Sequence, residues 1–173
     1  MKKALYILAE FSDRDFDWLL TTGRKKAVAA GSTLIREREP IDALYLVLQG
    51  TLTVSVEALD GAEVARLGSG EVVGEMSFVD SRNPSATVKA ATDAIVWSIP
   101  RSQLATKLLQ DKEFACHFYH AVAVFLSDRL RETMNSHSPA FEDSSVMNPQ
   151  FARNIELAEA RLSWLIDRLL KEK

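Results

Sequence analysis

The chain has 173 residues, of which 47% are hydrophobic and 26% charged, enough for one domain with its own core and an appended segment. Its 21 basic and 24 acidic residues give a formal net charge of −3, which argues against a nucleic-acid partner. The apolar runs are much shorter than the roughly eighteen residues of a membrane span, and the single Cys116 cannot form an internal disulfide, so we predict a soluble cytoplasmic protein without membrane contact.

The first predicted helix covers residues 13–22. The chain begins with a short apolar run after Lys3, which is too short for the apolar region of a signal peptide. Ser12 is then a candidate N-cap, and Asp15 stands where the acid of a capping box belongs. Gly23 is a good residue to end this helix.

Short strands are predicted over about residues 25–99. Residues 42–50 and 51–57 form two apolar runs separated by a glycine, and the second run alternates apolar with polar residues as a half-buried strand does. Asp60-Gly61 predicts a hairpin. Further glycines lie at the ends of the apolar runs, where an antiparallel roll requires tight corners: Gly31, Gly50, Gly68, Gly70 and Gly74.

Residues 70–90 have the composition of an anion-binding loop. Glycine at position 74 lets the backbone approach a ligand closely, and the amides of a short helical turn favour negative charge. Glu75 could accept hydrogen bonds from the hydroxyls of a sugar. The alternative is an ordinary surface loop between two strands.

Two helices are predicted after Pro100, over residues 102–110 and from Asp111, as N-cap, to about Met134. The longer one carries apolar residues on more than one face, which indicates burial on two sides. We expect one side to pack on the roll and the other on the same helix of a second subunit, through Phe118, Val122 and Phe125. A monomer with the helix folded flat is the alternative.

The end of the chain is predicted to be a linker followed by an amphipathic helix. Residues 135–148 are polar and rich in serine. Asn148-Pro149 then provides an N-cap and a first-turn proline, and an apolar stripe runs from Phe151 to Leu169. Because an isolated helix of this length is only marginally stable, some surface must cover the stripe. The surface would be the roll of the same subunit, the partner subunit, or the pocket region in place of a ligand, and we favour docking within the predicted dimer. The alternative is a helix that is free to bind an outside protein.

From about Leu8 to about Arg131 the sequence resembles the cyclic-nucleotide-binding domain of catabolite activator proteins, cyclic-nucleotide-dependent kinases and gated channels. The resemblance rests on the helix at 13–22, on the phrases GSTLIRERE and LYLVLQGTLTV, on GEMSF followed by SATVKA, and on the long helix ending DRLR. It implies an α+β, mainly β fold: an antiparallel, jelly-roll-like β-roll (a double-stranded β-helix) flanked by an N-terminal helix and C-terminal helices. The domains would be the roll with its long helix over 1–134, a linker over 135–148 and a helix over 149–173.

The resemblance also assigns roles to the residues of a ligand site. It implies that Glu75 takes the ribose 2′-hydroxyl, that Ser85 gives a hydroxyl, and that backbone amides approach the phosphate from the loop; the site residues are Gly74, Glu75, Met76, Ser77, Ser85, Ala86 and Thr87. Relatives hold the phosphate with an arginine immediately before Ser85, and this chain has Pro84 there. Arg82 is a possible substitute, and Thr133 matches a place where relatives contact the purine.

We therefore predict a regulatory or sensor module with no required cofactor, whose possible ligand is cAMP or cGMP, bound weakly because Pro84 offers no donor. It would form a homodimer through the 111–134 helix and act on another, unidentified protein. About forty residues follow Leu130, too few for a helix-turn-helix domain, so no nucleic acid is expected.

Two rival functions remain open. The first is a degenerate member that binds no cyclic nucleotide and serves as a dimerising scaffold or a sensor of another small anion. The second is a metal-dependent enzyme on a similar roll, for which His117 and His120 have a chelating spacing but lack nearby carboxylate or cysteine ligands in the sequence. No Walker loop, nucleophile elbow or zincin motif is present, so we do not predict an enzyme.

Overall fold

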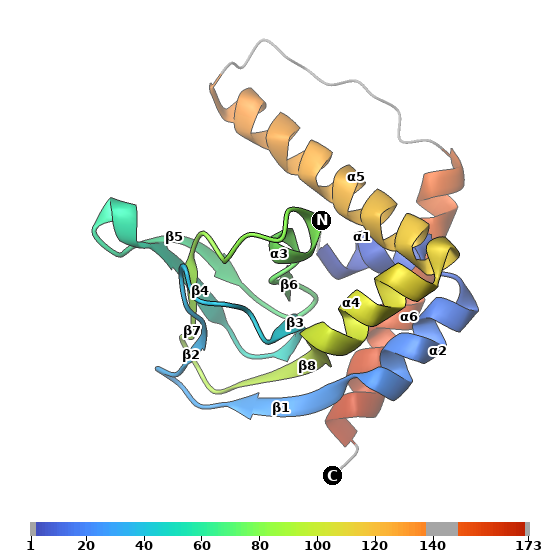
Figure 1. The fold of residues 1–173 in the computed structure, drawn as a ribbon, viewed down its shortest axis with the longest axis horizontal. Coiled ribbons are helices and arrows are strands. Elements are labelled where there is room, and N and C mark those ends of the chain that lie inside the picture. Colours follow the sequence, from blue (N-terminus) through green and yellow to red (C-terminus); the bar gives the residue numbers. More distant parts are fainter. Residues whose placement is uncertain (1–2, 138–148, 172–173) are drawn as a thin grey trace.

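The structure, a computed structural model, describes residues 3–137 and 149–171. Within these ranges the strands form two four-stranded antiparallel sheets that enclose a core between them (Figure 1). The strands are Arg24–Val28 (β1), Thr33–Ile35 (β2), Ala43–Gln49 (β3), Leu52–Val56 (β4), Ala62–Leu67 (β5), Val72–Val73 (β6), Thr87–Ala90 (β7) and Ala94–Pro100 (β8). The sheet orders are β1-β8-β3-β6 and β2-β7-β4-β5, which confirms the predicted roll.

The predicted corners of the roll are present. The β4–β5 hairpin turns through the short 3-10 helix η1 (Glu57–Leu59) and then through Asp60 and Gly61, both of which have positive φ. Gly50 also has a positive φ, and a Cβ there would lie 2.4 Å from the carbonyl oxygen of Asp93. Only glycine therefore fits the corner between β3 and β4.

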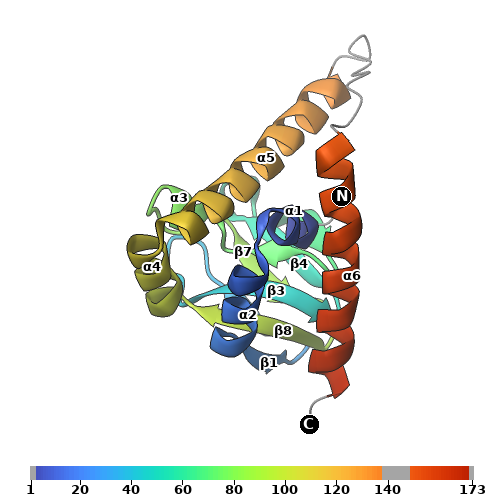
Figure 2. The same ribbon diagram turned by 90° about the vertical axis from the view of Figure 1, so that its right-hand side faces the viewer.

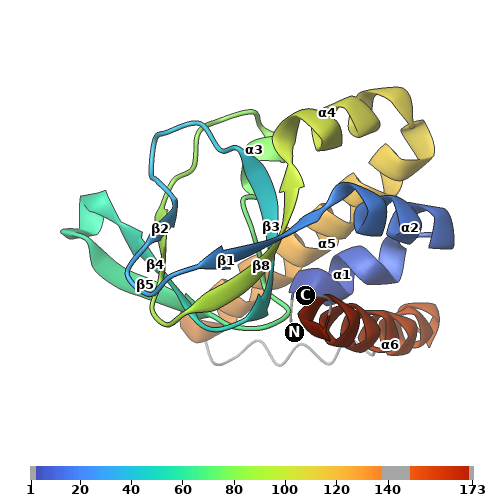
Figure 3. The same ribbon diagram turned by 90° about the horizontal axis from the view of Figure 1, so that it is seen from below.

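The helices gather at one end of the roll, and the longest of them extends from there alongside the roll (Figures 1 and 3). They are Lys3–Glu10 (α1), Asp13–Thr22 (α2), Arg101–Gln110 (α4), Lys112–His137 (α5) and Pro149–Lys171 (α6), while the single turn Met76–Val79 (α3) sits within the roll. In the described part of the chain, none of the helices is both long and apolar enough to span a bilayer.

Helix α1 has no counterpart in the sequence-based prediction. Its residues from Ala4 to Ala9 are all buried, because the helix lies between α5 and α6 (Figure 2). A helix that is apolar around its whole circumference needs cover on every side. The backbone amide of Ala4 donates to the carbonyl of Gly70 at 3.0 Å, which fixes the start of α1 next to the β5–β6 turn.

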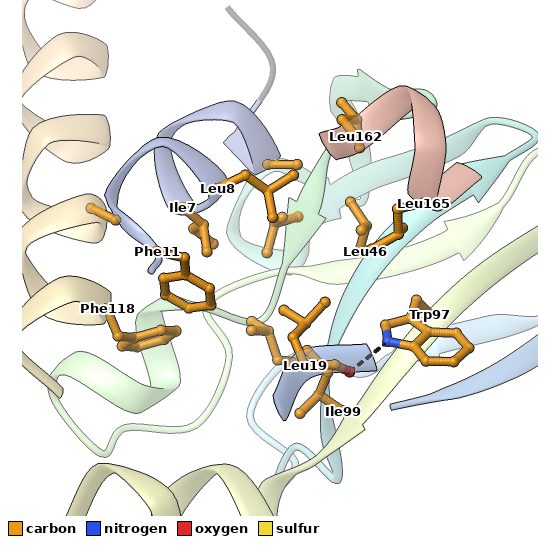
Figure 4. Close-up of a cluster of buried hydrophobic side chains, with 14 of the residues drawn as sticks. Ile7, Leu8, Phe11, Leu19, Leu46, Trp97, Ile99, Phe118, Leu162 and Leu165 are labelled. Atoms are coloured by element: carbon orange, nitrogen blue, oxygen red, sulfur yellow. Dashed lines mark hydrogen bonds between the residues drawn. The ribbon is translucent and has the colours of Figure 1, made fainter. Parts of the chain in front are cut away.

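Helix α2 confirms the capping box and adds a detail at its end. Ser12 and Asp15 exchange the expected hydrogen bonds. Gly23 is extended (φ −70°) and does not take the left-handed conformation typical of a glycine cap. It is needed for space instead, because a Cβ at this position would lie 1.9 Å from Nε1 of Trp97, which donates to the carbonyl of Leu19 (Figure 4).

The prediction that Phe118, Val122 and Phe125 of α5 form a surface for dimerisation is wrong. Phe118, Val122 and Phe125 are 1%, 2% and 6% exposed within the single chain, because α1 packs against them. The ring of Tyr6 on α1, for example, meets the ring of Phe125 edge to face at 5.8 Å. The second apolar side of α5 is thus covered by a helix of its own subunit. Large apolar side chains remain exposed on another face: Tyr119, Leu130 and Met134.

Helix α6 docks on its own subunit. Leu162 and Leu165 are buried against α1 and the first sheet, near Leu8, Leu46 and Trp97 (Figure 4). This confirms that a surface covers the apolar stripe, and shows that the surface is the roll and α1 of the same chain. Residues 135–137 of the predicted linker belong to α5, and the rest of it lies outside the described residues, as do Asn148 and the side chain of Phe151.

Arg161 of α6 binds the end of α1. Arg161 donates from Nη1 to the carbonyl oxygens of Leu8, at 3.0 Å, and Phe11, at 2.6 Å. Its other terminal nitrogen pairs with Asp13. The last carbonyls of a helix lack partners within the helix, so Arg161 acts as a C-cap supplied from another element.

Candidate ligand-binding site

A cavity of about 320 Å³ opens between the second sheet, the turn around α3 and the segment before β7. Seven of the ten residues predicted for the ligand site line it: Gly74, Glu75, Met76, Ser77, Pro84, Ser85 and Ala86. Two loops that are separated in sequence are therefore brought to one place, as the resemblance implied.

The first loop is shaped by Gly74. Its φ is +94°, and a Cβ there would lie 2.2 Å from Cδ1 of Ile41, so both the conformation and the space require glycine. The chain then turns directly into α3, and Glu75 is buried at the cavity wall. The neighbouring Met76 stays half exposed.

The second loop is anchored at Pro84. The amide of Arg38 donates to the carbonyl oxygen of Pro84 at 2.9 Å, and Nδ2 of Asn83 donates to the carbonyl oxygen of Arg38 at 2.8 Å. Pro84 lines the cavity but has neither an N–H group nor a polar side chain. This loop therefore offers an anion the hydroxyl of Ser85 and backbone amides, and no cation.

The opposite wall of the cavity is apolar and comes from strands β2, β4, β5, β6 and β7. Its larger side chains are Ile35, Val54, Val64, Leu67, Val73 and Val88. An apolar wall facing a few polar groups is the usual composition of a small-molecule site. The cavity can therefore accept a ligand with an apolar or aromatic body and one polar end.

Two cations that sequence reasoning missed also line the cavity, Lys3 from α1 and Arg129 from α5. Nζ of Lys3 lies 3.2 Å from Oε1 of Glu75, and the two side chains are only 11% and 7% exposed. The same ammonium lies 4.9 Å from the ring centroid of Phe125. No local pattern in the sequence signals a pair 72 residues apart.

Two predicted site residues, Arg82 and Thr87, are not among the residues that line the cavity. The Arg82 side chain is 85% exposed, and its Nε lies 3.8 Å from Oδ2 of Asp80. Thr87 accepts a hydrogen bond from the amide of Glu37 through its hydroxyl, at 3.1 Å, and is not among the lining residues. Thr133 belongs to α5, but its side chain lies outside the described part of the structure.

The loop around α3 is connected to the helices. Nη2 of Arg101, at the start of α4, donates to the carbonyl oxygen of Ser77 at 3.3 Å, and its guanidinium lies 5.0 Å from the ring centroid of Phe78. The Phe78 ring in turn meets Phe118 of α5. A change at the cavity loop can therefore reach α4 and α5 through direct contacts.

The histidines considered as metal ligands bind carboxylates of neighbouring helices. His117 Nδ1 lies 2.7 Å from Oδ2 of Asp15, and His120 Nδ1 lies 2.9 Å from Oε2 of Glu10. Burial raises the pKa of Asp15, but its hydrogen bonds with Ser12 and His117 outweigh this and hold the pKa below 3.8. Over the described ranges, no three His, Cys, Asp or Glu residues are grouped as metal ligands.

Comparison with known proteins points to one family. Residues 25–111 match the family model described as the cyclic nucleotide-binding domain. An uncharacterized NTE family protein of Mycobacterium tuberculosis is 34% identical over 109 residues, which are 60% of this chain and 18% of that protein. A cGMP-dependent protein kinase of Caenorhabditis elegans is 38% identical over 82 residues, 46% of this chain and 10% of the kinase. The chain thus spans less than a fifth of the length of these two curated relatives.

A solved structure agrees with the fold. The crystal structure of a cyclic nucleotide-binding domain from Methylobacillus flagellatus superposes with a TM-score of 0.67 at 23% identity. The match covers 83% of this chain and 85% of that one. At this level of identity the likeness shows the fold of the roll and its flanking helices, and nothing about the ligand.

Proposed function

The chain belongs to the cyclic nucleotide-binding domain family, and from this we propose that it is a sensor module that binds cAMP or cGMP weakly in the cavity beside Glu75. The observation that carries the proposal is the meeting of the 74–77 and 84–86 loops around one cavity with a buried carboxylate in its wall. A small-molecule site is usually a concave, largely apolar cavity with a few polar groups, and this cavity has that composition.

The residues of the cavity fit a cyclic nucleotide in part. Glu75 accepts the ribose hydroxyl, the hydroxyl of Ser85 faces the phosphate, and the apolar wall receives the base. Pro84 supplies no hydrogen-bond donor for the phosphate at the position where relatives have an arginine. A hydrogen bond to a charged group contributes about 1.5–3 kcal/mol, so the loss of the arginine weakens binding roughly ten- to 150-fold.

Calorimetric titration with cAMP and with cGMP tests this proposal. We expect at least one of them to bind weakly and saturably, at ligand concentrations well above micromolar. Glu75→Gln should bind it more weakly still. The 5′-monophosphates serve as controls, because they lack the cyclic phosphate. If neither cyclic nucleotide binds at millimolar concentration, the proposed ligand is wrong.

One rival function is favoured by a specific observation. Pro84 removes the donor for the phosphate, and Lys3 already pairs with Glu75. The chain would then be a degenerate member that binds no cyclic nucleotide, and would act as a dimerising scaffold or bind another small anion. The same titrations, extended to inorganic phosphate, distinguish this function from the first.

We further propose that the module acts in the cytoplasm, without catalysis, as a homodimer that contacts a downstream protein. The exposed apolar side chains of α5, Tyr119, Leu130 and Met134, support a dimer through a different face of that helix from the one predicted. They recur at positions one turn or several turns apart, which places them along one side of the helix. Burying such a face against its two-fold copy is the commonest way to cover it.

A further inference from the structure

We infer that Lys3 is a ligand-binding residue that supplies the positive charge missing from position 84, so the cation of this site comes from α1 and not from the loop before β7. The inference rests on the proposed function, because it names the group that would hold the anionic part of the ligand. Nothing in the family match covers Lys3, since that match begins at residue 25.

Contacts within the chain fix the position of Lys3. The hydrogen bond from the Ala4 amide to Gly70 holds the start of α1 beside the cavity, and the following residues of α1 are buried between two helices. The ring of Phe125 lies 4.9 Å from the ammonium and limits where it can go. Such preorganisation reduces the entropy lost when a ligand is bound.

The charges around the cavity favour an anion only when Lys3 is included. Glu75 alone would put a buried negative charge in the wall of a site that has to accept a phosphate, and like charges at short range in a partly buried site repel strongly. The charged residues that line the cavity are Lys3, Arg129 and Glu75. With Lys3 the lining carries two positive charges and one negative charge, so the balance favours an anion; without Lys3 the lining is neutral.

The pair also presents the two kinds of group that a cyclic nucleotide needs. The ammonium has three N–H groups, and among the described residues it uses one of them on Oε1 of Glu75, while Oε2 remains an acceptor. A donor cation and an acceptor oxygen therefore lie side by side. A 3′,5′-cyclic phosphate has its free 2′-hydroxyl on the carbon next to the esterified one, so the phosphate can meet Lys3 while the hydroxyl meets Glu75.

The test compares ligand binding by the full chain with Lys3→Gln, which keeps a hydrogen-bond donor but removes the charge. Lys3→Arg keeps the charge, and Lys112→Gln, an exposed lysine of α5 that does not line the cavity, is the matched control. The probes are cAMP, cGMP and inorganic phosphate, measured by calorimetry and by thermal stabilisation. We expect Lys3→Gln to weaken cyclic-nucleotide binding about tenfold or more. Lys3→Arg should bind much better than Lys3→Gln, and Lys112→Gln should bind like the wild type.

A second measurement separates binding from a purely structural role. Pro84→Arg places a guanidinium on the loop, so the effect of Lys3→Gln should be several-fold smaller in that background than in the wild type. If Lys3 only supports the fold, its replacement lowers the melting temperature equally in both backgrounds, and the loss of affinity is the same in both.

Each outcome decides the inference. If a cyclic nucleotide binds and Lys3→Gln binds it equally or more tightly, Lys3 is not the cation and the inference is wrong, while the proposed function stands. If no cyclic nucleotide binds but inorganic phosphate stabilises the wild type and Lys112→Gln more than Lys3→Gln, the anion-binding role of Lys3 holds and the proposed nucleotide is wrong. If none of the three probes binds, both are wrong.

Discussion

The ring of Phe78 on α3 meets the ring of Phe118 on α5 edge to face, with 6.4 Å between the centroids and 77° between the planes. Phe78 lies one residue beyond the cavity residue Ser77, and Phe118 is 1% exposed in the core shared with α1. The contact thus joins the ligand-site turn to the long helix within one subunit. It is one of the contacts through which occupancy of the cavity can reach α5, besides Arg129 of α5, which lines the cavity itself.

Weakening this contact should separate binding from response. We expect Phe78→Leu to keep cyclic-nucleotide affinity within a few-fold, because the side chain does not line the cavity, and to reduce the change that the ligand causes in hydrogen exchange along α5. The exposed Val79 gives a control, Val79→Ala, which should respond like the wild type. An undiminished response in Phe78→Leu would place the coupling elsewhere.

Replacing Pro84 with arginine should tighten cyclic-nucleotide binding. The new guanidinium gives the phosphate a charge-assisted pair of donors, and we expect a gain of roughly ten- to 150-fold in affinity by calorimetry. Pro84→Ala removes the ring without adding a donor and should give no comparable gain. Arg82→Ala should bind like the wild type, because that side chain is 85% exposed. Tight binding by the native protein would contradict the role given to position 84.

The proposed dimer can be tested on two faces of α5. Leu130→Glu changes a residue that is 57% exposed, so it should shift the protein from dimer to monomer in light scattering while leaving its melting temperature nearly unchanged. Val122→Glu changes a residue that is 2% exposed and buries a charge without a partner, so it should unfold or aggregate the protein. A wild-type monomer at tens of micromolar would show that the dimer proposal is wrong.

Helix α6 should contribute to the stability of the subunit. Leu165 is 0% exposed, so Leu165→Ala should lower the free energy of unfolding by about 2–5 kcal/mol. Leu157 on the same helix is 51% exposed, and Leu157→Ala should change the free energy of unfolding by about 0.5 kcal/mol at most. Chemical denaturation measures both. Truncation after residue 148 should lower the melting temperature more than Leu165→Ala does. An unchanged melting curve would contradict the docking seen in the structure.

Asp15 should make stability depend on acid pH. Its pKa is held below 3.8 in the folded protein, so its ionised form stabilises the fold above about pH 4, and this contribution is lost as the pH falls through the folded pKa. Urea denaturation at pH 7 to 3 should show Asp15→Asn less stable than the wild type near neutrality, with the difference shrinking towards pH 3. Asp17→Asn, an exposed neighbour, should follow the wild type throughout. A difference that stays constant with pH would mean that ionisation of Asp15 is not involved.

The elements with strong local signals were predicted from the sequence. The Ser12–Asp15 capping box begins α2 as expected, Asp60-Gly61 makes the hairpin, and Asp111 accepts a hydrogen bond from the Phe114 amide at the start of α5. Gly74 takes the positive φ expected of a glycine at a tight corner. These features depend on turn and cap chemistry within a few residues, which a sequence displays directly.

Only the tertiary structure decided which elements bury each apolar helix face. The apolar run after Lys3 is too short to show a period, and its burial between α5 and α6 depends on contacts with residues more than a hundred positions away. Because α1 fills that place, Phe118 and Val122 face their own subunit and not a partner. For the same reason Lys3 reaches Glu75, 72 residues along the chain. A pattern of hydrophobicity says that a face must be buried; which surface buries it is decided by the packing of the whole chain.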